Sequence, residues 1–235
     1  TIKQRQKIEN GLRSSLENDQ FTLAFMPIFD CDNDDIVAVE ALLRCRAPEL
    51  EGIGPDQFIP VAESTGLIKE IDLWVVDHAL QSLVVLHQQH NFTGKMCINI
   101  SGVELNNENF PPLIKRLLET HKVNPCSVEL EVTETALVAG DKACLETLNA
   151  LNELGVSLAL DDFGTGYTAF SQLIHYPAHC LKIDRSFVSD LFSEKEPRSK
   201  MVLIIQNLAE LYGLRVIAEG VETEEQLNYL KRHGC

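Results

Sequence analysis

Residues 127–162 of the chain read SVELEVTETALVAGDKACLETLNALNELGVSLALDD. Two short runs rich in Val and Leu, at 127–132 and 156–160, flank a stretch at 142–154 whose apolar residues recur at helical spacing. A strand, a helix and a second strand in this order predict two parallel neighbours joined by a crossover helix. The second run ends on two consecutive acids, Asp161 and Asp162, so charged side chains stand at the carboxyl end of a predicted strand.

The same alternation extends along the rest of the chain. Strand-like runs are predicted at 21–29, 36–43, 95–100, 127–132, 156–160, 180–183 and 215–218. Helical stretches are predicted at about 56–66, 68–89, 111–121, 142–154, 198–212 and 223–233. Seven strands in one uninterrupted series predict an α/β fold of the TIM-like (β/α)8 barrel type.

The two ends of this series depart from the regular pattern. A short turn rich in Asp and Asn, residues 30–35, joins the first two runs, so we expect the first strand to be antiparallel to the rest. An eighth strand would have to follow Cys235. The first residue is Thr1 and residues 1–20 are polar and favour helix. We therefore expect a piece of a longer protein, with residues 1–20 as a helical lead-in or linker from a preceding domain and 21–235 as the barrel.

Composition excludes several classes of protein. Hydrophobic residues make up 45% of the 235 residues and charged residues 23%, as in ordinary globular domains. The net charge of −15 argues against binding to a DNA or RNA polymer, and an anionic ligand would need metal ions or a local Arg/Lys cluster. Seven Cys without a C-x-x-C pair, together with apolar runs too short to span a membrane, predict a cytoplasmic domain; the full-length protein could still be membrane-anchored.

Polar side chains recur at the carboxyl ends of the predicted strands. They are Glu40, Asn99, Glu131, Asp161, Asp162, Lys182, Asp184 and Glu219. The carboxyl ends of barrel strands meet at one mouth, where barrel enzymes hold their chemistry. Carboxylates gathered there repel one another unless cations lie between them, and hard oxygen ligands suit Mg²⁺ or Mn²⁺. The sequence thus predicts a two-metal site bridged by Asp161-Asp162, with Lys182 holding a water or a phosphate.

Each of these residues also has a structural interpretation. Asp-Asp-Phe-Gly is often only a turn, and a strand Lys is often only a surface residue. Residues 164–169 superficially match a dinucleotide-binding loop, but the two preceding acids would face the pyrophosphate. The recurrence of polar residues at the same end of six strands favours a functional site over these readings.

Short motifs follow one another in a fixed order along the chain. They are VEALLR at 39–44, FIP at 58–60, AESTGLI at 62–68, NIS at 99–101, EVTE at 131–134, DDFGTGY at 161–167, LKIDRSF at 181–187 and AEGVET at 218–223. In this order they resemble the EAL-domain cyclic di-GMP phosphodiesterases of bacteria, whose name-giving motif is Glu40-Ala41-Leu42. The resemblance covers the chain from about residue 20 to its end.

The resemblance implies metal-dependent hydrolysis of cyclic di-GMP to linear pGpG. It places one metal ion on four residues and a second ion on two, with Glu219 nearby. The first set is Glu40, Asn99, Glu131 and Asp161, and the second is Asp161 and Asp162.

The family also implies further roles and partners. Lys182, Glu219 and Glu40 would be catalytic, with Lys182 orienting the attacking water, and Arg44 and Asp184 would contact substrate. The loop from Asp162 to Tyr167, with Glu222, would couple dimer contacts to metal binding. The implied partners are a second copy of the chain and an upstream sensory or GGDEF domain.

Two departures and two alternatives accompany this reading. Met26 stands where the family usually has Gln, and the family's last strand lies beyond Cys235.

A catalytically silent cyclic di-GMP receptor, acting through a protein partner, is the main alternative to an enzyme, and a purely structural interaction module is the other. Silent members of the family lose acids of the metal set, whereas this chain keeps each one that it is long enough to contain, which favours the enzyme.

Overall fold

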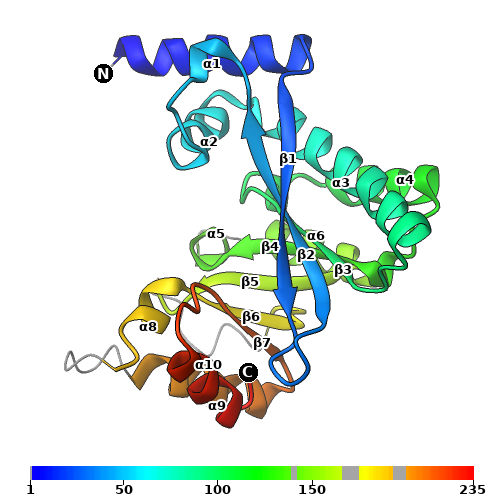
Figure 1. Cartoon of the computed structure of the whole chain (residues 1–235). Helices are drawn as coiled ribbons and strands as arrows, with labels where there is room; N and C mark the ends of the chain where they lie inside the picture. The colour runs from blue at the N-terminus through cyan, green and yellow to red at the C-terminus, as the bar shows by residue number, and fades with distance from the viewer. Residues whose placement is uncertain (1, 139–141, 166–174, 193–199) are drawn as a thin grey trace.

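A computed structural model describes residues 2–138, 142–165, 175–192 and 200–235 (Figure 1). Seven strands form one sheet in chain order, with β1 antiparallel to β2 and every other neighbouring pair parallel. The strands are β1 (Phe21–Phe29), β2 (Ile36–Cys45), β3 (Lys95–Asn99), β4 (Val128–Thr133), β5 (Ser157–Phe163), β6 (Cys180–Ile183) and β7 (Arg215–Ala218). This arrangement confirms the predicted α/β fold, a TIM-like barrel with its first strand antiparallel.

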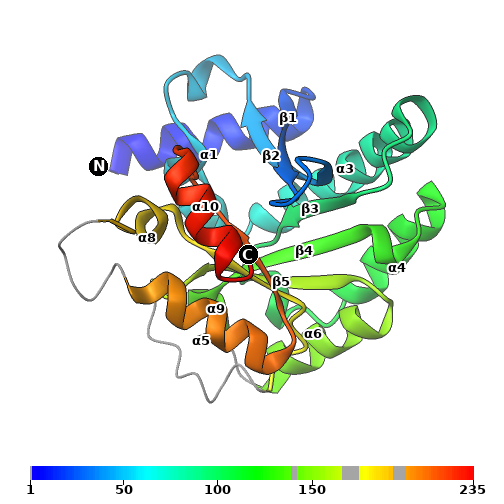
Figure 2. The same cartoon turned by 60° about the horizontal axis from the view of Figure 1, so that its bottom comes forward.

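Helices alternate with the strands and surround them on the outside (Figure 2). They are α1 (Ile2–Glu17), α2 (Pro55–Thr65), α3 (Ile68–His90), α4 (Phe110–His121), α5 (Glu134–Val138), α6 (Lys142–Glu153), α8 (Arg185–Ser189), α9 (Met201–Tyr212) and α10 (Glu224–Arg232). Short 3-10 turns lie at η1 (Pro48–Leu50), η2 (Glu104–Asn106) and η3 (Pro125–Ser127). None of the described helices has the length and apolar character needed to cross a membrane.

Within the lead-in expected at residues 1–20, helix α1 spans Ile2–Glu17 and packs on the barrel. Ile8 and Leu12 of α1 are buried, and the helix lies against α2 and η1. Arg5 of α1 also donates a hydrogen bond to Ser64 Oγ of α2 at 2.9 Å. The helix therefore touches an element that lines the candidate site described below.

The central strands are buried on both faces, as expected of parallel strands covered by crossover helices. Each residue of β4 from Val128 to Val132 is buried, and so is each residue of β6. Half of their residues are Val, Leu or Ile, which pack well in this setting. Three charged residues, Glu129, Glu131 and Lys182, also lie deep inside the sheet, and burying such groups is costly unless they are paired.

Three strands extend beyond their predicted ends, and β4 does so by Thr133 alone. β2 continues to Cys45 because Phe21 at the start of β1 pairs with it. β5 continues through Asp161 and Asp162 to Phe163, and its register against β6 shifts between Leu160 and Phe163. Such an irregularity re-aims side chains locally, and here it falls on the two acids.

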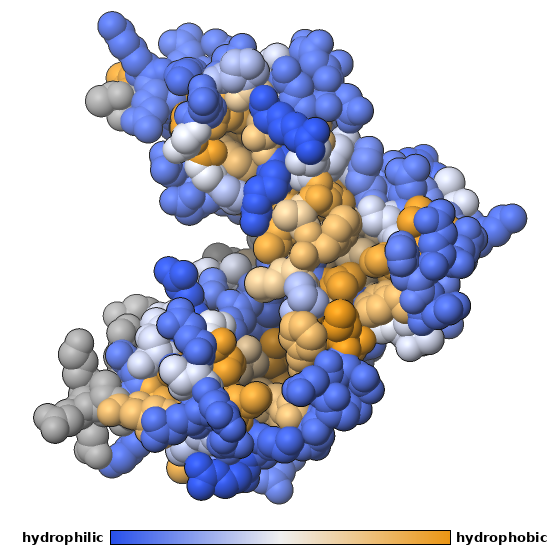
Figure 3. All heavy atoms as spheres, in the orientation of Figure 1, coloured by the Kyte–Doolittle hydropathy of each residue, from blue (hydrophilic) through white to orange (hydrophobic). Residues whose placement is uncertain are grey.

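β1 and β7 stand at the two ends of the strand order, and a cavity of about 590 Å³ lies between them. It is lined by Met26 to Phe29 of β1 and by Val216 to Ala218 of β7. Apolar side chains gather at the middle of the molecular face drawn in Figure 3. On β1, the side chains of Phe25, Met26 and Phe29 are exposed.

Candidate active site

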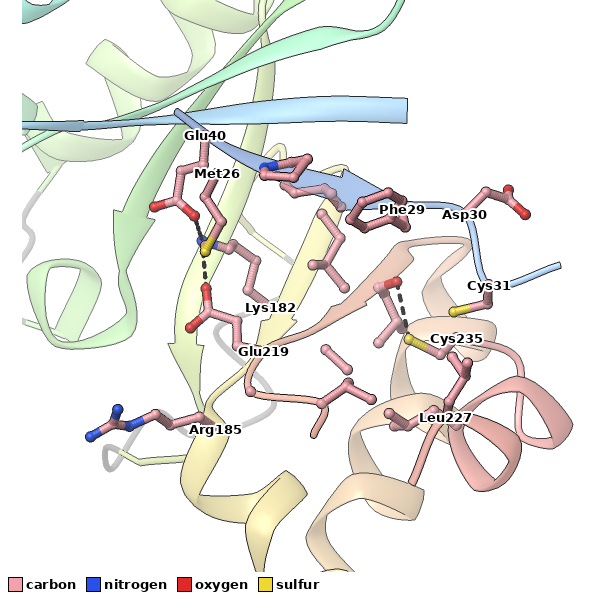
Figure 4. A pocket seen from close by; sticks show the side chains of 18 of the residues that line it. Met26, Phe29, Asp30, Cys31, Glu40, Lys182, Arg185, Glu219, Leu227 and Cys235 are labelled. Carbon is pink, nitrogen blue, oxygen red and sulfur yellow. Dashed lines mark hydrogen bonds and ion pairs between the residues drawn. The ribbon is translucent and has the colours of Figure 1, made fainter. Parts of the chain in front are cut away.

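The ammonium of Lys182 on β6 lies among four carboxylates, which come from β2, β4, β5 and the residue that follows β7. Figure 4 shows two of them, Glu40 and Glu219, joined to the ammonium by dashed lines. Its Nζ is 2.6 Å from Glu131 Oε2 on β4 and 2.9 Å from Glu219 Oε1 just after β7. The distances to Glu40 Oε2 on β2 and to Asp161 Oδ1 on β5 are both 3.4 Å. The lysine side chain is only 1% exposed, so these contacts are shielded from water.

Strand register brings these residues to the same level. Asn99 at the end of β3 pairs with Glu131, and Thr133 pairs with Asp161. Asn99 Nδ2 donates to Glu40 Oε1 at 2.7 Å, which links β3 to β2 across the site. One predicted residue from the end of each of six strands therefore belongs to this cluster, as the barrel interpretation requires: Glu40, Asn99, Glu131, Asp161, Lys182 and Glu219.

Glu219 is positioned by the backbone around it. Its N–H donates to the carbonyl of Ile183 at 3.0 Å, which holds the end of β7 beside β6. Gly220 follows with a φ of 68°, and a Cβ there would lie 2.6 Å from the Arg185 side chain. A glycine is suited to this position because it tolerates both the backbone angle and the close approach.

The cluster holds more negative than positive charge. Burial raises the pKa of Glu131 to about 8, although Lys182 opposes this shift. Burial also raises the pKa of Glu219. For Lys182, burial disfavours the charged form, but the carboxylates of Glu131, Asp161, Glu40 and Glu219 outweigh it and raise its pKa. Lys182 is thus a permanent cation at neutral pH.

One buried oxygen of the cluster has no protein partner among the described residues. Glu131 Oε2 accepts the hydrogen bond from Lys182, whereas Glu131 Oε1 has no hydrogen bond and no access to solvent. An unpaired buried carboxylate oxygen is costly, and such an atom calls for an explanation such as a bound ion.

Asp161 and Asp162 lie at the end of β5, where its register against β6 is irregular. Asp162 has a φ of 55°, which is uncommon outside glycine, and its N–H donates to Asp161 Oδ1 at 2.9 Å. Burial and the neighbouring charges of Asp161 and Asp184 raise the pKa of Asp162. The backbone conformation thereby sets two carboxylates side by side at the mouth of the barrel.

In the part of the chain that the structure describes, no three His, Cys, Asp or Glu side chains are arranged as ligands around one point. The Lys182 ammonium stands among the carboxylates instead. The donor chemistry nevertheless fits Mg²⁺ or Mn²⁺, because the side chains offer carboxylate and amide oxygens and Glu131 Oε1 is unpaired.

A second cavity, of about 620 Å³, continues outward from this cluster. The cavity is lined by Glu131, Asp161 and Asp162 of the cluster region, and also by Arg44 of β2 and Glu63 of α2. Its volume is in the range of small-molecule sites. Arg44 donates from Nη1 to the carbonyl of Leu43 at 2.8 Å and otherwise faces solvent.

The remaining predicted residues lie further out. Asp184 caps α8: its Oδ1 accepts the N–H of Ser186 at 3.0 Å, which gives it a structural task. Glu222 is exposed, and its N–H donates to Gln226 Oε1 at 2.8 Å. Their predicted roles in substrate binding and loop coupling stay predictions. Gly166 and Tyr167 of the coupling loop lie outside the described residues.

Met26, the departure noted in the sequence, pairs with Glu40 in the β1–β2 ladder. It lines the cavity between β1 and β7, together with Glu40, Lys182 and Glu219 (Figure 4). A thioether at this position is a weak acceptor and no donor, so it contributes no strong hydrogen bond to the site.

Sequence reasoning missed a supporting network on the wall of the second cavity. The buried carboxylate of Asp72 on α3 accepts the N–H of Ser101 at 3.1 Å, and Ser101 Oγ donates to Glu63 Oε1 at 2.7 Å. These bonds fix the loop that follows Asn99. A signal existed, because Asp72 lies between Ile71 and Val75 on the apolar side of its helix, where an acid needs a partner.

The fold and the site define a TIM-like barrel with a carboxylate-rich centre at the strand ends. Comparison with known proteins identifies the family within this class of fold. The family described as "EAL domain" matches residues 9–235. The chain belongs to this family of cyclic di-GMP phosphodiesterases.

Individual relatives agree with this placement. "Cyclic di-GMP phosphodiesterase NbdA" of Pseudomonas aeruginosa is 36% identical over 232 residues, which is 99% of this chain and 30% of that protein. "Cyclic di-GMP phosphodiesterase PdeR" of Escherichia coli K12 is 32% identical over 97% of this chain and 34% of its own length. The chain spans about a third of the length of the curated relatives it matches.

A solved structure gives the same answer for the fold. The "PaMucR Phosphodiesterase, c-di-GMP complex" superposes with a TM-score of 0.89 at 35% sequence identity. The match covers 97% of this chain and 92% of that one. The barrel described above is therefore the fold of a chain solved with cyclic di-GMP.

Proposed function

We propose that this chain hydrolyses cyclic di-GMP to linear pGpG with the help of two Mg²⁺ or Mn²⁺ ions. The observation that carries the proposal is the set of four carboxylates and one amide gathered around Lys182, with the buried oxygen of Glu131 left unpaired. Relatives more than 30% identical over nearly the whole chain are named as cyclic di-GMP phosphodiesterases, which supports the same reaction here.

The residues that would hold the ions are those predicted from the sequence. Glu40, Asn99, Glu131 and Asp161 would hold one ion, and Asp161 with Asp162 would hold the other, with Glu219 beside them. When bound, the ions would neutralise phosphoryl oxygens and lower the pKa of a water molecule.

Lys182 would act as a fixed hydrogen-bond donor. Its pKa is raised by the surrounding carboxylates, so it keeps its proton at neutral pH and cannot serve as a base. An ammonium in this position can orient the attacking water or stabilise charge that develops on the phosphate. Glu40 and Glu219 contact Lys182 and would hold it in place for this task.

Arg44 would bind a phosphate of the substrate from the second cavity. Its guanidinium lies at the rim of that cavity, whose inner end is formed by Glu131, Asp161 and Asp162. In a protein with a net charge of −15, a cation at the mouth favours entry of an anionic ligand. Asp184 would contact substrate from the end of β6.

The wider setting is also part of the proposal. We propose that the domain is cytoplasmic and forms a homodimer, whose contacts are coupled to the site through Asp162 and Glu222. We also propose that it belongs to a longer protein with an upstream sensory or GGDEF domain. A relative named "Bifunctional diguanylate cyclase/cyclic di-GMP phosphodiesterase MucR", of which this chain matches 33%, supports that last assignment.

Incubation of the purified chain with cyclic di-GMP and Mg²⁺, followed by separation of the nucleotides, tests the proposal. Formation of linear pGpG supports the enzyme. Bound but intact cyclic di-GMP would instead identify a silent receptor that acts through a partner. If the chain neither binds nor hydrolyses cyclic di-GMP, the function that remains is that of a structural interaction module.

A further inference from the structure

A buried acid outside the Lys182 cluster contacts the loop that follows Asn99. Asp72 lies on α3 among buried apolar residues such as Ile71 and Val75, and it is only 5% exposed. A carboxylate in such surroundings is costly to bury unless it accepts hydrogen bonds. Its Oδ2 accepts the N–H of Ser101 at 3.1 Å, so this bond reaches a residue only two positions after Asn99.

The start of this loop is held from two sides. On the side of β4, the N–H of Ile100 donates to the carbonyl of Glu131 at 2.9 Å. On the side of α3, the carboxylate of Asp72 holds the N–H of Ser101. Because β3 ends at Asn99, the two bonds fix the first two residues after the strand. The backbone that carries the Asn99 side chain is therefore anchored to a strand on one side and to a helix on the other.

The side chain of Ser101 provides a second, weaker anchor. Its Oγ donates to Glu63 Oε1 of α2 at 2.7 Å and accepts the N–H of Val103 at 3.2 Å. Glu63 is exposed, so water competes for this bond, whereas Asp72 is buried, and a hydrogen bond is stronger where water is excluded. The position of the loop therefore depends chiefly on Asp72.

The loop matters because Asn99 reaches the cluster with its side chain, where Nδ2 donates to Glu40 Oε1 at 2.7 Å. Residues that hold a metal ligand in place affect metal affinity nearly as much as the ligand itself. We propose that Asp72 is a positioning residue of the metal site, which keeps the amide of Asn99 directed at the cluster by fixing the backbone at Ser101. This inference rests on the proposed function, in which Asn99 is a metal ligand.

Two substitutions of Asp72 separate the hydrogen bond from the negative charge. Asp72→Leu has nearly the shape of aspartate and suits the apolar surroundings, but it leaves the N–H of Ser101 without this acceptor. Asp72→Asn loses the charge and keeps an acceptor oxygen. We expect the apparent dissociation constant for Mn²⁺, measured by electron paramagnetic resonance, to rise about 10–100-fold in Asp72→Leu and to change little in Asp72→Asn. Unchanged binding in Asp72→Leu, or equal weakening in both variants, would overturn the proposal.

A double-mutant cycle tests whether Asp72 acts through Asn99. Asn99→Ala removes the proposed ligand, so adding Asp72→Leu in that background should weaken Mn²⁺ binding little further. Full additivity of the two changes would overturn the proposal. Asp77→Leu is the matched control, because Asp77 lies on the same helix but is half-exposed and pairs with His121 of α4 at 2.7 Å. This variant should bind Mn²⁺ like the unmodified chain.

Kinetics separate this role from direct contact with substrate, since Asp72 also lines the second cavity. At saturating Mg²⁺, Asp72→Leu should regain most of its rate and keep its KM for cyclic di-GMP. A raised KM with unchanged Mn²⁺ affinity would identify Asp72 as a substrate-binding residue instead. If the unmodified chain forms no pGpG, the proposed function fails, whereas the Mn²⁺ measurements still decide the role of Asp72.

Amide hydrogen exchange, followed by NMR on the metal-free protein, tests the anchoring bond without metal or substrate. In the unmodified chain, the N–H of Ser101 should exchange much more slowly than an open loop amide. Asp72→Leu should remove this protection and Asp72→Asn should retain it. Fast exchange at Ser101 in the unmodified chain would overturn the proposal, and that result depends on no variant being able to fold.

Discussion

The Nζ atom of Lys182 lies 2.6 Å from Glu131 Oε2, and both side chains are almost completely buried. Three further carboxylates share this single cation, so the pair is part of a cluster with surplus negative charge. A buried pair of this kind is weak support for stability, because desolvation offsets much of the attraction. Its arrangement at the strand ends is better explained by the reaction proposed for the site.

Replacing Glu131 should stop hydrolysis while the fold is retained. Glu131→Gln removes a proposed metal ligand, so we expect the rate to fall at least about 10²-fold. Lys182 would still contact Glu40, Asp161 and Glu219, so no uncompensated charge is left behind. Steady-state hydrolysis, with circular dichroism as a check on folding, measures both effects.

Glu129→Gln is the matched control for that variant. Glu129 is a buried acid on the same strand, and it pairs with Lys95 and Arg215 outside the Lys182 cluster. This change should lower stability but leave Mg²⁺ binding intact. Substantial turnover by Glu131→Gln would show that Glu131 is not a ligand.

Lys182→Met should lower kcat much more than it raises KM. A contact made mainly in the transition state reduces kcat and kcat/KM together, and its loss typically costs about 10²–10³-fold. The variant also leaves four carboxylates without their shared cation, so the metal-free protein should be destabilised and Mg²⁺ should restore much of the loss. Kinetics at saturating Mg²⁺ and a metal titration of the same variant check both points.

Lys95→Met provides the comparison, since Lys95 pairs with Glu129 away from the site and its loss should leave kcat and KM unchanged. If Lys182→Met raises KM and keeps kcat, the lysine binds substrate in the ground state and the role given to it is wrong.

The choice of metal should be strict. Mg²⁺ and Mn²⁺ should support hydrolysis, and Ca²⁺ should support little or none, because Ca²⁺ takes more ligands at longer distances and misplaces the water and the phosphate. Initial rates in each metal, after removal of bound ions with a chelator, give the answer. Comparable rates in Ca²⁺ would contradict a tightly arranged two-metal site.

Stability of the metal-free protein should fall as the pH rises. Glu131 has a pKa of about 8 in the folded chain against an ordinary value of 4.5, so the folded state holds a proton that the unfolded chain releases. The stability that the folded protein gains by holding this proton on Glu131 is fully present below about pH 4.5 and is lost as the pH rises through about 8. Glu219 and Asp162 shift in the same direction.

We therefore expect the free energy of unfolding, measured with urea in the presence of a chelator, to drop by about 1–3 kcal/mol between about pH 5 and pH 8. In Glu131→Gln the drop should be smaller. A metal-free protein whose stability rises over this range would show that Glu131 is ionised throughout.

Much of the fold and of the site could be predicted from the sequence, for identifiable reasons. The strands carry short apolar runs, and an acid, an amide or a lysine interrupts or ends most of them, so the convergence of Glu40, Glu131 and Lys182 follows from barrel topology. The extension of β5 through Asp162 could not be foreseen, because a register shift depends on tertiary pairing with β6. The position of Asp72 on the apolar side of its helix indicates that it needs a partner, but the identity of that partner could not be foreseen, because Ser101 lies 29 residues away.

The rate of pGpG formation as a function of Mg²⁺ concentration is the most direct test of the central claim, that the carboxylates around Lys182 form a two-metal hydrolytic site. We expect no product after treatment with a chelator, a saturable rise in rate as Mg²⁺ is added back, and no recovery in Glu131→Gln at any Mg²⁺ concentration. Equal rates of pGpG formation with and without Mg²⁺, or a Glu131→Gln variant as fast as the unmodified chain, would contradict the claim.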